Sequence, residues 1–211
     1  MSDAVRGLVE GADRDRWLAT LYAPAALRSA ILAVHALDLE FAKITAMTSD
    51  AMLGEIKLAW WRERLVDLDA GVVPAQPVLR ALAAEVVPRG VTGATLAGFE
   101  DGWLALAAGD VAEHIELRGR AVGGVLADLA GADATAGGQL GAVWAGGEAA
   151  RAGHDVVVPA PVRAAPSLRW LAGLAALGRR DVDRSARGLP LEARATAARQ
   201  WVMLRAALTG R

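Results

Sequence analysis

Pairs of carboxylates spaced one helical turn apart are the side chains of this sequence that could most directly do chemistry. On a helix such a pair converges on one face, where its oxygens could hold Mg²⁺ and, through it, a diphosphate. Glu63 and Asp67 have this spacing, as do Asp110 and Glu113. Each pair also has a simpler explanation: Glu63 stands between two arginines, and Asp110 and Glu113 fall in a first helical turn, where acids favour the helix dipole. We expect the simpler explanation for both pairs.

The three histidines do not form a recognisable metal site. A di-iron bundle uses Glu-x-x-His pairs, and no Asp or Glu stands three residues before His35, His114 or His154. His35 lies among apolar residues at helical spacing, so we expect a satisfied core histidine. His154 precedes Asp155 in a segment that we expect to be a solvated loop.

Composition excludes several other classes of function. The chain has no cysteine, which removes disulfides, thiolate zinc sites and cysteine nucleophiles. The phosphate-binding glycine motifs and the G-x-S-x-G elbow are absent. With 23 basic and 24 acidic residues, the formal charge of −1 gives no general attraction to nucleic acid.

Helices must position these residues. Ala and Leu dominate the 54% hydrophobic content and aromatic residues make up only 5%, which is typical of helical packing. The one strand-like run is Val156 to Val158. We predict a single all-α domain, residues 1–211, of about nine helices. The predicted helices cover residues 17–22, 25–47, 51–68 after a Thr48-Ser49-Asp50 cap, 77–87, 95–108, 110–129, 134–150, 167–177 and 191–208.

Two of these predictions concern packing and location. Residues 51–68 carry apolar side chains on two faces, so we expect that helix to be covered on two sides. No apolar stretch approaches the roughly 18 residues of a membrane span, and no signal peptide is evident. We expect a cytoplasmic protein without a transmembrane segment; peripheral contact with the inner face of the membrane stays open.

Two segments resemble the squalene/phytoene synthase superfamily. Residues 28–37, following the helix and Pro24 of residues 15–24, fit the pattern R-x-A-(I/L)-x-A-(L/V)-(Y/H)-A-(F/L). Residues 53–62, LGEIKLAWWR, resemble L-G-E-(I/M)-(R/K)-L-x-W-W-R. That second pattern is typical of one branch, which includes bacterial relatives and the mitochondrial complex I assembly factor of the family.

The resemblance implies an isoprenoid-synthase-like helical bundle, with helices trimmed relative to the family, and it locates two departures. Active members carry D-D-x-x-D or a close variant where this chain has Ala42-Lys43-Ile44-Thr45-Ala46. The second acidic motif should fall near residues 148–155, where only Glu148 and Asp155 are acidic. Both expected Mg-diphosphate clamps are therefore degenerate, and Lys43 adds a cation to the first.

We accordingly expect a protein that has lost prenyltransferase catalysis and acts as a binding or assembly factor, related in type to respiratory-complex assembly. Such a pseudoenzyme needs no cofactor. Its partner would be a protein or a hydrophobic or isoprenoid ligand. The candidate residues lining its cavity are His35, Asp38, Phe41, Trp60 and Trp61.

The alternative is an active head-to-head prenyltransferase of the phytoene or squalene synthase type, with relocated Mg-binding carboxylates. Asp38 and Glu40 are two residues apart and point to different sides of a helix, which argues against a local relocation. The candidate acids for this alternative are Asp38, Glu40, Glu63, Asp67, Asp110 and Glu113.

Overall fold

The computed structural model describes residues 3–47, 51–160 and 162–211, apart from the side chain of residue 51. The predicted cap at 48–50 lies outside this part. The all-α prediction is confirmed, since the described residues contain helices, turns and loops and no strand. The eleven α-helices of this part are α1 (Asp3–Ala12), α2 (Arg14–Leu21), α3 (Arg28–Met47), α4 (Ala51–Asp67), α5 (Pro77–Glu85), α6 (Gly93–Ala97), α7 (Phe99–Ala107), α8 (Val111–Leu129), α9 (Ala134–Arg151), α10 (Arg169–Ala186) and α11 (Ala197–Thr209). Short 3₁₀ turns η1 (Ala25–Leu27), η2 (Leu68–Ala70), η3 (Val87–Arg89) and η4 (Pro166–Leu168) connect some of them.

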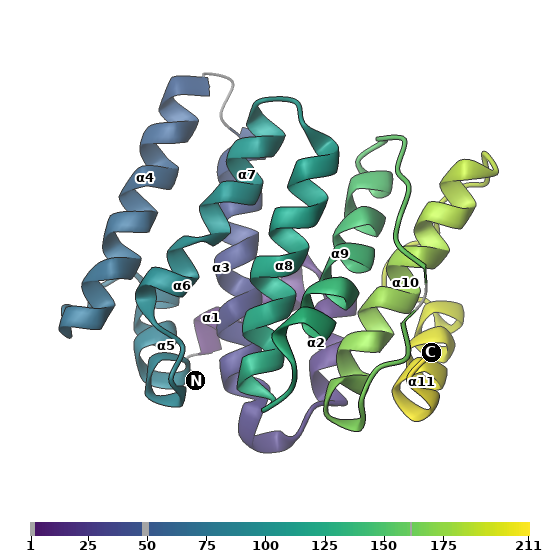
Figure 1. Cartoon of the computed structure of the whole chain (residues 1–211), viewed down its shortest axis with the longest axis horizontal. Coiled ribbons are helices and arrows are strands. Elements are labelled where there is room, and N and C mark those ends of the chain that lie inside the picture. Colours follow the sequence, from purple (N-terminus) through teal and green to yellow (C-terminus); the bar gives the residue numbers. More distant parts are fainter. Residues whose placement is uncertain (1–2, 48–50, 161) are drawn as a thin grey trace.

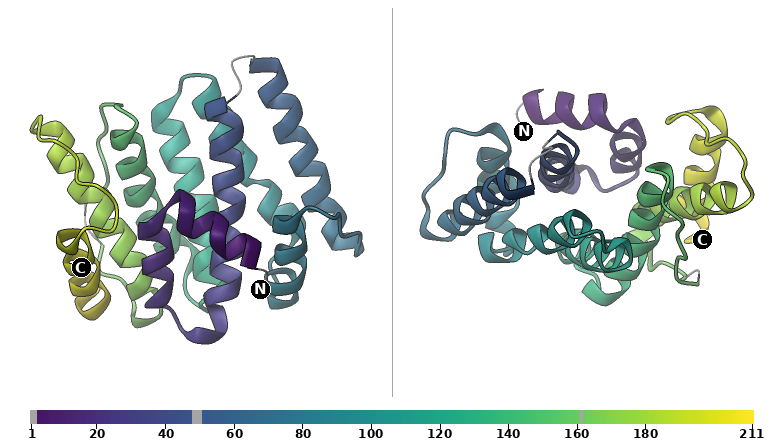
Figure 2. Two further views of the ribbon diagram at one scale, coloured as in Figure 1. Left: turned by 180° about the vertical axis from the view of Figure 1, so that it is seen from behind. Right: turned by 90° about the horizontal axis from the view of Figure 1, so that it is seen from above.

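The helices form two layers, and α3 belongs to the second of them. In Figure 1, α4, α7, α8, α9 and α10 stand in a row, and Figure 2 shows α1, α2 and α3 behind that row. α3 contacts α1, α2, α4, α5, α7 and α8, so it is the central element of the fold. None of the described helices is long and apolar enough to cross a membrane.

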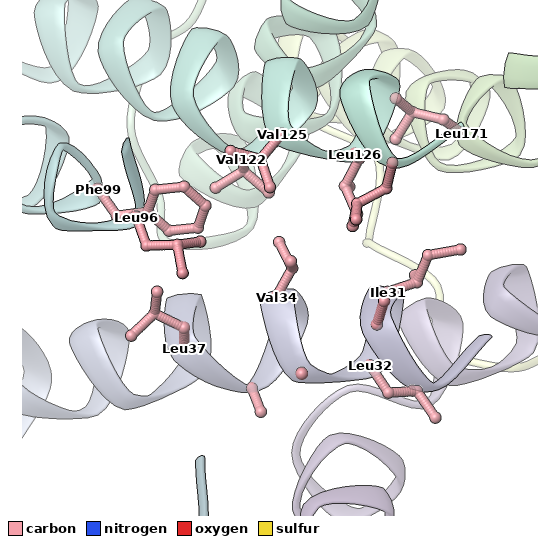
Figure 3. Close-up of a cluster of buried hydrophobic side chains, with 14 of the residues drawn as sticks. Ile31, Leu32, Val34, Leu37, Leu96, Phe99, Val122, Val125, Leu126 and Leu171 are labelled. Carbon is pink, nitrogen blue, oxygen red and sulfur yellow. The ribbon is translucent and has the colours of Figure 1, made fainter. Parts of the chain in front are cut away.

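The core is built where α3 faces the row. Ile31, Val34 and Leu37 of α3 point toward apolar side chains from four other helices, whereas Leu32 points to the other side of α3, as Figure 3 shows. Their partners are Leu96 of α6, Phe99 of α7, Val122, Val125 and Leu126 of α8, and Leu171 of α10. All ten side chains are buried. The helical spacing seen in residues 25–47 therefore does mark the central helix.

The helix count exceeds the predicted nine for two reasons. α1 has no counterpart among the predicted helices. The helix predicted at 95–108 is divided at Gly98, because the two parts have different neighbours: Asp69 of η2 accepts hydrogen bonds from the backbone of Gly93 and Ala94 and holds α6 near α4, while α7 packs on α8. Helical boundaries elsewhere also moved, since α10 continues to Ala186 and α11 begins only after its Thr196 cap.

The prediction that the helix of residues 51–68 is covered on two sides is wrong. α4 is the outermost helix of the row (Figure 1), so only one face has neighbours. Leu58, Trp61 and Leu65 are buried, whereas Ile56 is 58% exposed and Trp60 is 44% exposed. Apolar side chains on the second face of α4 are therefore a surface feature.

A glycine seam joins α8 to α9. Gly119 and Gly123 of α8 lie against Gly137 and Gly141 of α9, and a Cβ atom built at Gly123 would overlap the carbonyl oxygen of Gly137. Glycine inside a helix costs roughly 1 kcal/mol relative to alanine. The close approach of the two backbones explains why glycine occurs at these helical positions despite that cost.

Two neighbouring glycines provide a matched test of this seam. We expect Gly123→Ala to destabilise the protein by about 1–3 kcal/mol, the usual cost of overpacking. Gly124→Ala should instead stabilise it by about 1 kcal/mol through helix propensity, because its Cβ would come no closer than 3.8 Å to another atom of the described residues. Urea unfolding of both variants checks this prediction. Equal changes in the free energy of unfolding would contradict a close approach of α8 and α9 at Gly123.

Candidate functional site

Asp38, on the buried face of α3, is fully enclosed by donors from three other helices. Arg16 of α2 donates from Nη1 to Oδ2 of Asp38 at 2.7 Å. Arg118 of α8 donates from Nε to Oδ1 at 2.9 Å and from Nη2 to Oδ2 at 2.7 Å. Trp103 of α7 completes the set, with its indole N–H 3.3 Å from Oδ1. Both carboxylate oxygens are therefore occupied by protein donors.

Aromatic rings support the two arginines that hold Asp38. The guanidinium carbons of Arg16 and Arg118 lie 4.5 and 4.6 Å from the ring centroid of Trp144 on α9. Arg118 also lies 4.6 Å from the Trp103 ring. Cation–π contacts are strongest away from water, and all these side chains are buried. Trp144 thereby ties α9 to the Asp38 cluster.

The ion pairs continue from Asp38 toward the C-terminal helices. Arg16 bonds Asp13 at 2.9 Å, and Arg194 pairs with Asp13 at 3.1 Å and with Glu148 at 2.7 Å. Arg199 of α11 bonds Asp15 at 2.9 Å and is bidentate to Asp181 of α10, which Arg151 also contacts. We call these residues the charge network. Its five carboxylates and five guanidinium groups are Asp13, Asp15, Asp38, Glu148, Asp181, Arg16, Arg118, Arg151, Arg194 and Arg199.

The protonation states of the buried carboxyl groups follow from the balance between burial and the neighbouring positive charges. Burial by itself raises the pKa of Asp38, but the charges and hydrogen bonds of Arg118 and Arg16 outweigh it and hold the pKa well below its ordinary value. Burial likewise opposes ionisation of Glu148, and Arg194 and Arg16 bring its pKa below the ordinary range. Burial raises the pKa of Asp13. Asp38 and Glu148 are therefore charged at neutral pH.

Two histidines beside the network are held neutral. Burial lowers the pKa of His35 to about 3, with the nearby Arg16 and Arg118 charges adding to the effect and Asp38 opposing it. Burial lowers the pKa of His114 to about 4, and its Nδ1 lies 2.6 Å from the carbonyl oxygen of Gly102, to which it donates. His35 lies in the core as predicted, but neither ring nitrogen has a partner among the described residues.

A cavity of about 200 Å³ adjoins the network. Leu39 and Ala42 of α3 line one side, and Glu148, Ala149 and Ala152 line another. These are the two places where the sequence resemblance expects acidic motifs, so the fold brings both motif segments to one cavity. The other lining residues are Ala12, Asp13, Arg16, Trp103, Leu106, His114, Arg118, His154 and Arg194.

The residues around this cavity do not fit Mg²⁺. The motif positions that line it are three alanines, His154 and Glu148, Arg194 holds Glu148, and the Asp38 carboxylate has no free oxygen. Three guanidinium groups face the space and would repel a cation. Lys43, expected to oppose the metal, is exposed at the surface instead. The positive charge expected from Lys43 is supplied at the cavity by Arg16, Arg118 and Arg194.

None of the candidate residues, His35 and Asp38 included, lines this cavity. Phe41 and Trp61 pack edge to face in the core with ring centroids 5.9 Å apart, and Trp60 lies beside Trp61 with its outer face exposed. Glu40 is half-buried on α3. Glu63 and Asp67 pair with Arg64 on α4, Asp110 caps α8 by accepting from the backbone N–H of Glu113, and Glu113 is exposed. Asp38 alone of the candidate acids belongs to the charge network.

Sequence reasoning missed the arginines and Trp144. One signal was present: His114, Arg118 and Val122 share a helix face, and a charged residue on an otherwise buried face requires a buried partner. The identity of that partner depends on contacts between distant segments, since Arg118 and Asp38 are 80 residues apart.

The fold and the site together define the class of this protein. It is an all-α bundle with buried acidic and basic side chains that neutralise one another at its centre. Residues 9–96 match the family model described as squalene/phytoene synthase. This match supports a relationship to the squalene/phytoene synthase superfamily, and it includes Asp13, Asp15, Arg16 and Asp38 of the network. Comparison with curated proteins and with solved structures finds no match.

Removing the central carboxylate tests whether the network is needed for stability. Asp38→Asn leaves Arg118 buried without its counter-charge and removes one of the carboxylates that Arg16 contacts, so we expect a loss of about 3–5 kcal/mol in the free energy of unfolding. Asp155→Asn, at an exposed position, should change it by less than about 0.5 kcal/mol. Urea denaturation compares them, and similar stabilities would show that Asp38 contributes little.

His35 should make the protein sensitive to mild acid. Its folded pKa of about 3 lies below the ordinary 6.5, so the unfolded chain takes up the proton first and stability is lost as the pH falls below 6.5. At pH 5 this amounts to about 2 kcal/mol. We expect His35→Leu to be as stable as the parent at pH 7 and more stable than it at pH 5, measured by urea unfolding. Parallel loss of stability in both proteins would contradict this.

Proposed function

We propose that this protein is a non-catalytic relative of the squalene/phytoene synthases that acts by binding, as an assembly or carrier factor. One observation carries the proposal. The two motif segments meet at one cavity, yet the groups they present there are alanines, His154 and a carboxylate already bound by arginine. Prenyl diphosphate ionisation needs metal-bound charge at this place, and the arginines oppose it.

The assembly form of this proposal draws support from α4. Residues 53–62 resemble the branch that contains an assembly factor, and α4 presents Ile56 and Trp60 at the surface. Exposed aromatic and aliphatic side chains of this kind are enriched in protein interfaces. We place the protein in the cytoplasm as a single helical domain, with a protein or hydrophobic ligand as partner and neither nucleic acid nor a cofactor.

The proposal predicts a negative result under conditions that favour catalysis. Purified protein incubated with farnesyl or geranylgeranyl diphosphate, Mg²⁺ and NADPH should form no hydrocarbon product by gas chromatography. Calorimetry should detect no Mg-dependent diphosphate binding, because the metal ligands are missing.

A squalene or phytoene synthase with intact aspartate-rich motifs is the positive control. Turnover by this protein would overturn the proposal and favour relocated ligands. In that case Asp38→Asn, if still folded by circular dichroism, and Glu40→Gln would identify the acid responsible.

A further inference from the structure

A groove at the α10 end of the row differs from the central cavity in the charge and polarity of its lining. It encloses about 620 Å³ between α9, α10, α11 and the segment before η4. Small-molecule sites typically measure about 300–1,000 Å³. Its floor is apolar and is formed by Leu140, Val143, Ala172, Ala175, Trp201 and Val202.

Arginines supply all the charge along this groove. Arg163, Arg179, Arg205 and Arg211 line it, and no lining residue is acidic. Arg163, Arg205 and Arg211, together with Thr209, also line an adjoining hollow of about 330 Å³. The charged end and the apolar floor are therefore neighbouring parts of one surface.

The backbone holds these arginines together. The N–H of Ala164 donates to the carbonyl oxygen of Gly210 at 2.9 Å, which places Arg163 beside Arg211. Arg205 is one helical turn after Trp201 on α11. None of the three has a side-chain hydrogen bond or ion pair with another described residue, in contrast to the arginines of the charge network.

We propose that this groove binds a single-chain lipid with a phosphate head group. Three unneutralised guanidinium groups complement a phosphate, which carries up to two negative charges and three acceptor oxygens, better than a carboxylate with one charge. The apolar floor receives the alkyl chain, which contacts the Trp201 ring, 67% exposed before binding. The volume of about 620 Å³ lies in the range of small-molecule sites, so the proposed ligand is a separate molecule and not a bilayer surface.

Dodecyl phosphate below its critical micelle concentration is the probe. Calorimetry and tryptophan emission should both report binding, with a blue shift that disappears in Trp201→Phe. Dodecanol, which lacks the charge, and inorganic phosphate, which lacks the chain, should each bind at least about tenfold more weakly.

Matched double variants locate the head group. R163Q/R205Q should weaken dodecyl phosphate binding roughly tenfold to hundredfold. R14Q/R80Q removes the same charge at two exposed positions that line neither hollow, and its affinity should equal that of the parent. Ala176→Phe, which keeps the arginines and narrows the groove, should also weaken binding.

Three outcomes would overturn the proposal. Equal affinity of R163Q/R205Q and the parent would show that the arginines do not hold the head group. Sedimentation with intact phosphatidate vesicles, without binding of the monomeric probe, would assign the groove to a membrane surface. A parent dimer that R163Q/R205Q converts to monomer would assign it to a second copy of the chain. Because this site is separate from the central cavity, these outcomes leave the proposed loss of catalysis unaffected.

Discussion

The rest of the structure depends on the enclosure of the Asp38 carboxylate by Arg16 and Arg118. Removing a carboxylate from water costs several kcal/mol even after relaxation, and the cost is recovered only with well-placed counter-charges and complete hydrogen bonding. Asp38 meets this condition through donors from α2, α7 and α8. A displacement of any of these helices would remove at least one hydrogen bond from the buried carboxylate. The network therefore specifies their arrangement around α3 more strictly than apolar packing alone could do.

The glycine seam makes this enclosure possible. Arg118 precedes Gly119 on α8, and Trp144 lies less than one turn after Gly141 on α9. Because the two backbones approach closely at these glycines, the Trp144 ring comes within 4.6 Å of the Arg118 guanidinium. Larger residues in the seam would move the ring away from the arginines. The packing of α8 against α9 thus also determines the surroundings of the Asp38 carboxylate on α3. Arg199 connects α11 to the same network through Asp15 and Asp181.

Local patterns predicted much of the fold and little of the site. The apolar spacing of residues 25–47 is a local signal, and α3 follows from it. α8 and α11 were also predicted, but α11 begins at Ala197 and not at residue 191, because Thr196 caps it. The exposure of the second face of α4 was not predictable in this way, because whether an apolar face is buried depends on the neighbours that the topology supplies. The partners of Asp38 come from 22 residues before it and 80 after it. The unpaired arginines of the groove likewise become notable only when the structure shows no acid beside them.

The two arginine clusters differ in whether acidic side chains neutralise them, and this difference bears on where a ligand could bind. A metal-dependent site needs an excess of negative charge, and the five carboxylates and five guanidinium groups at the centre do not provide one. Such a balanced cluster attracts neither cations nor anions strongly. In the groove, arginines without partners keep their field and border an apolar floor. Since free energy of binding comes from charge that the protein has not already neutralised, recognition in this molecule should reside at the α9, α10 and α11 surface, with the central network serving to hold those helices in place.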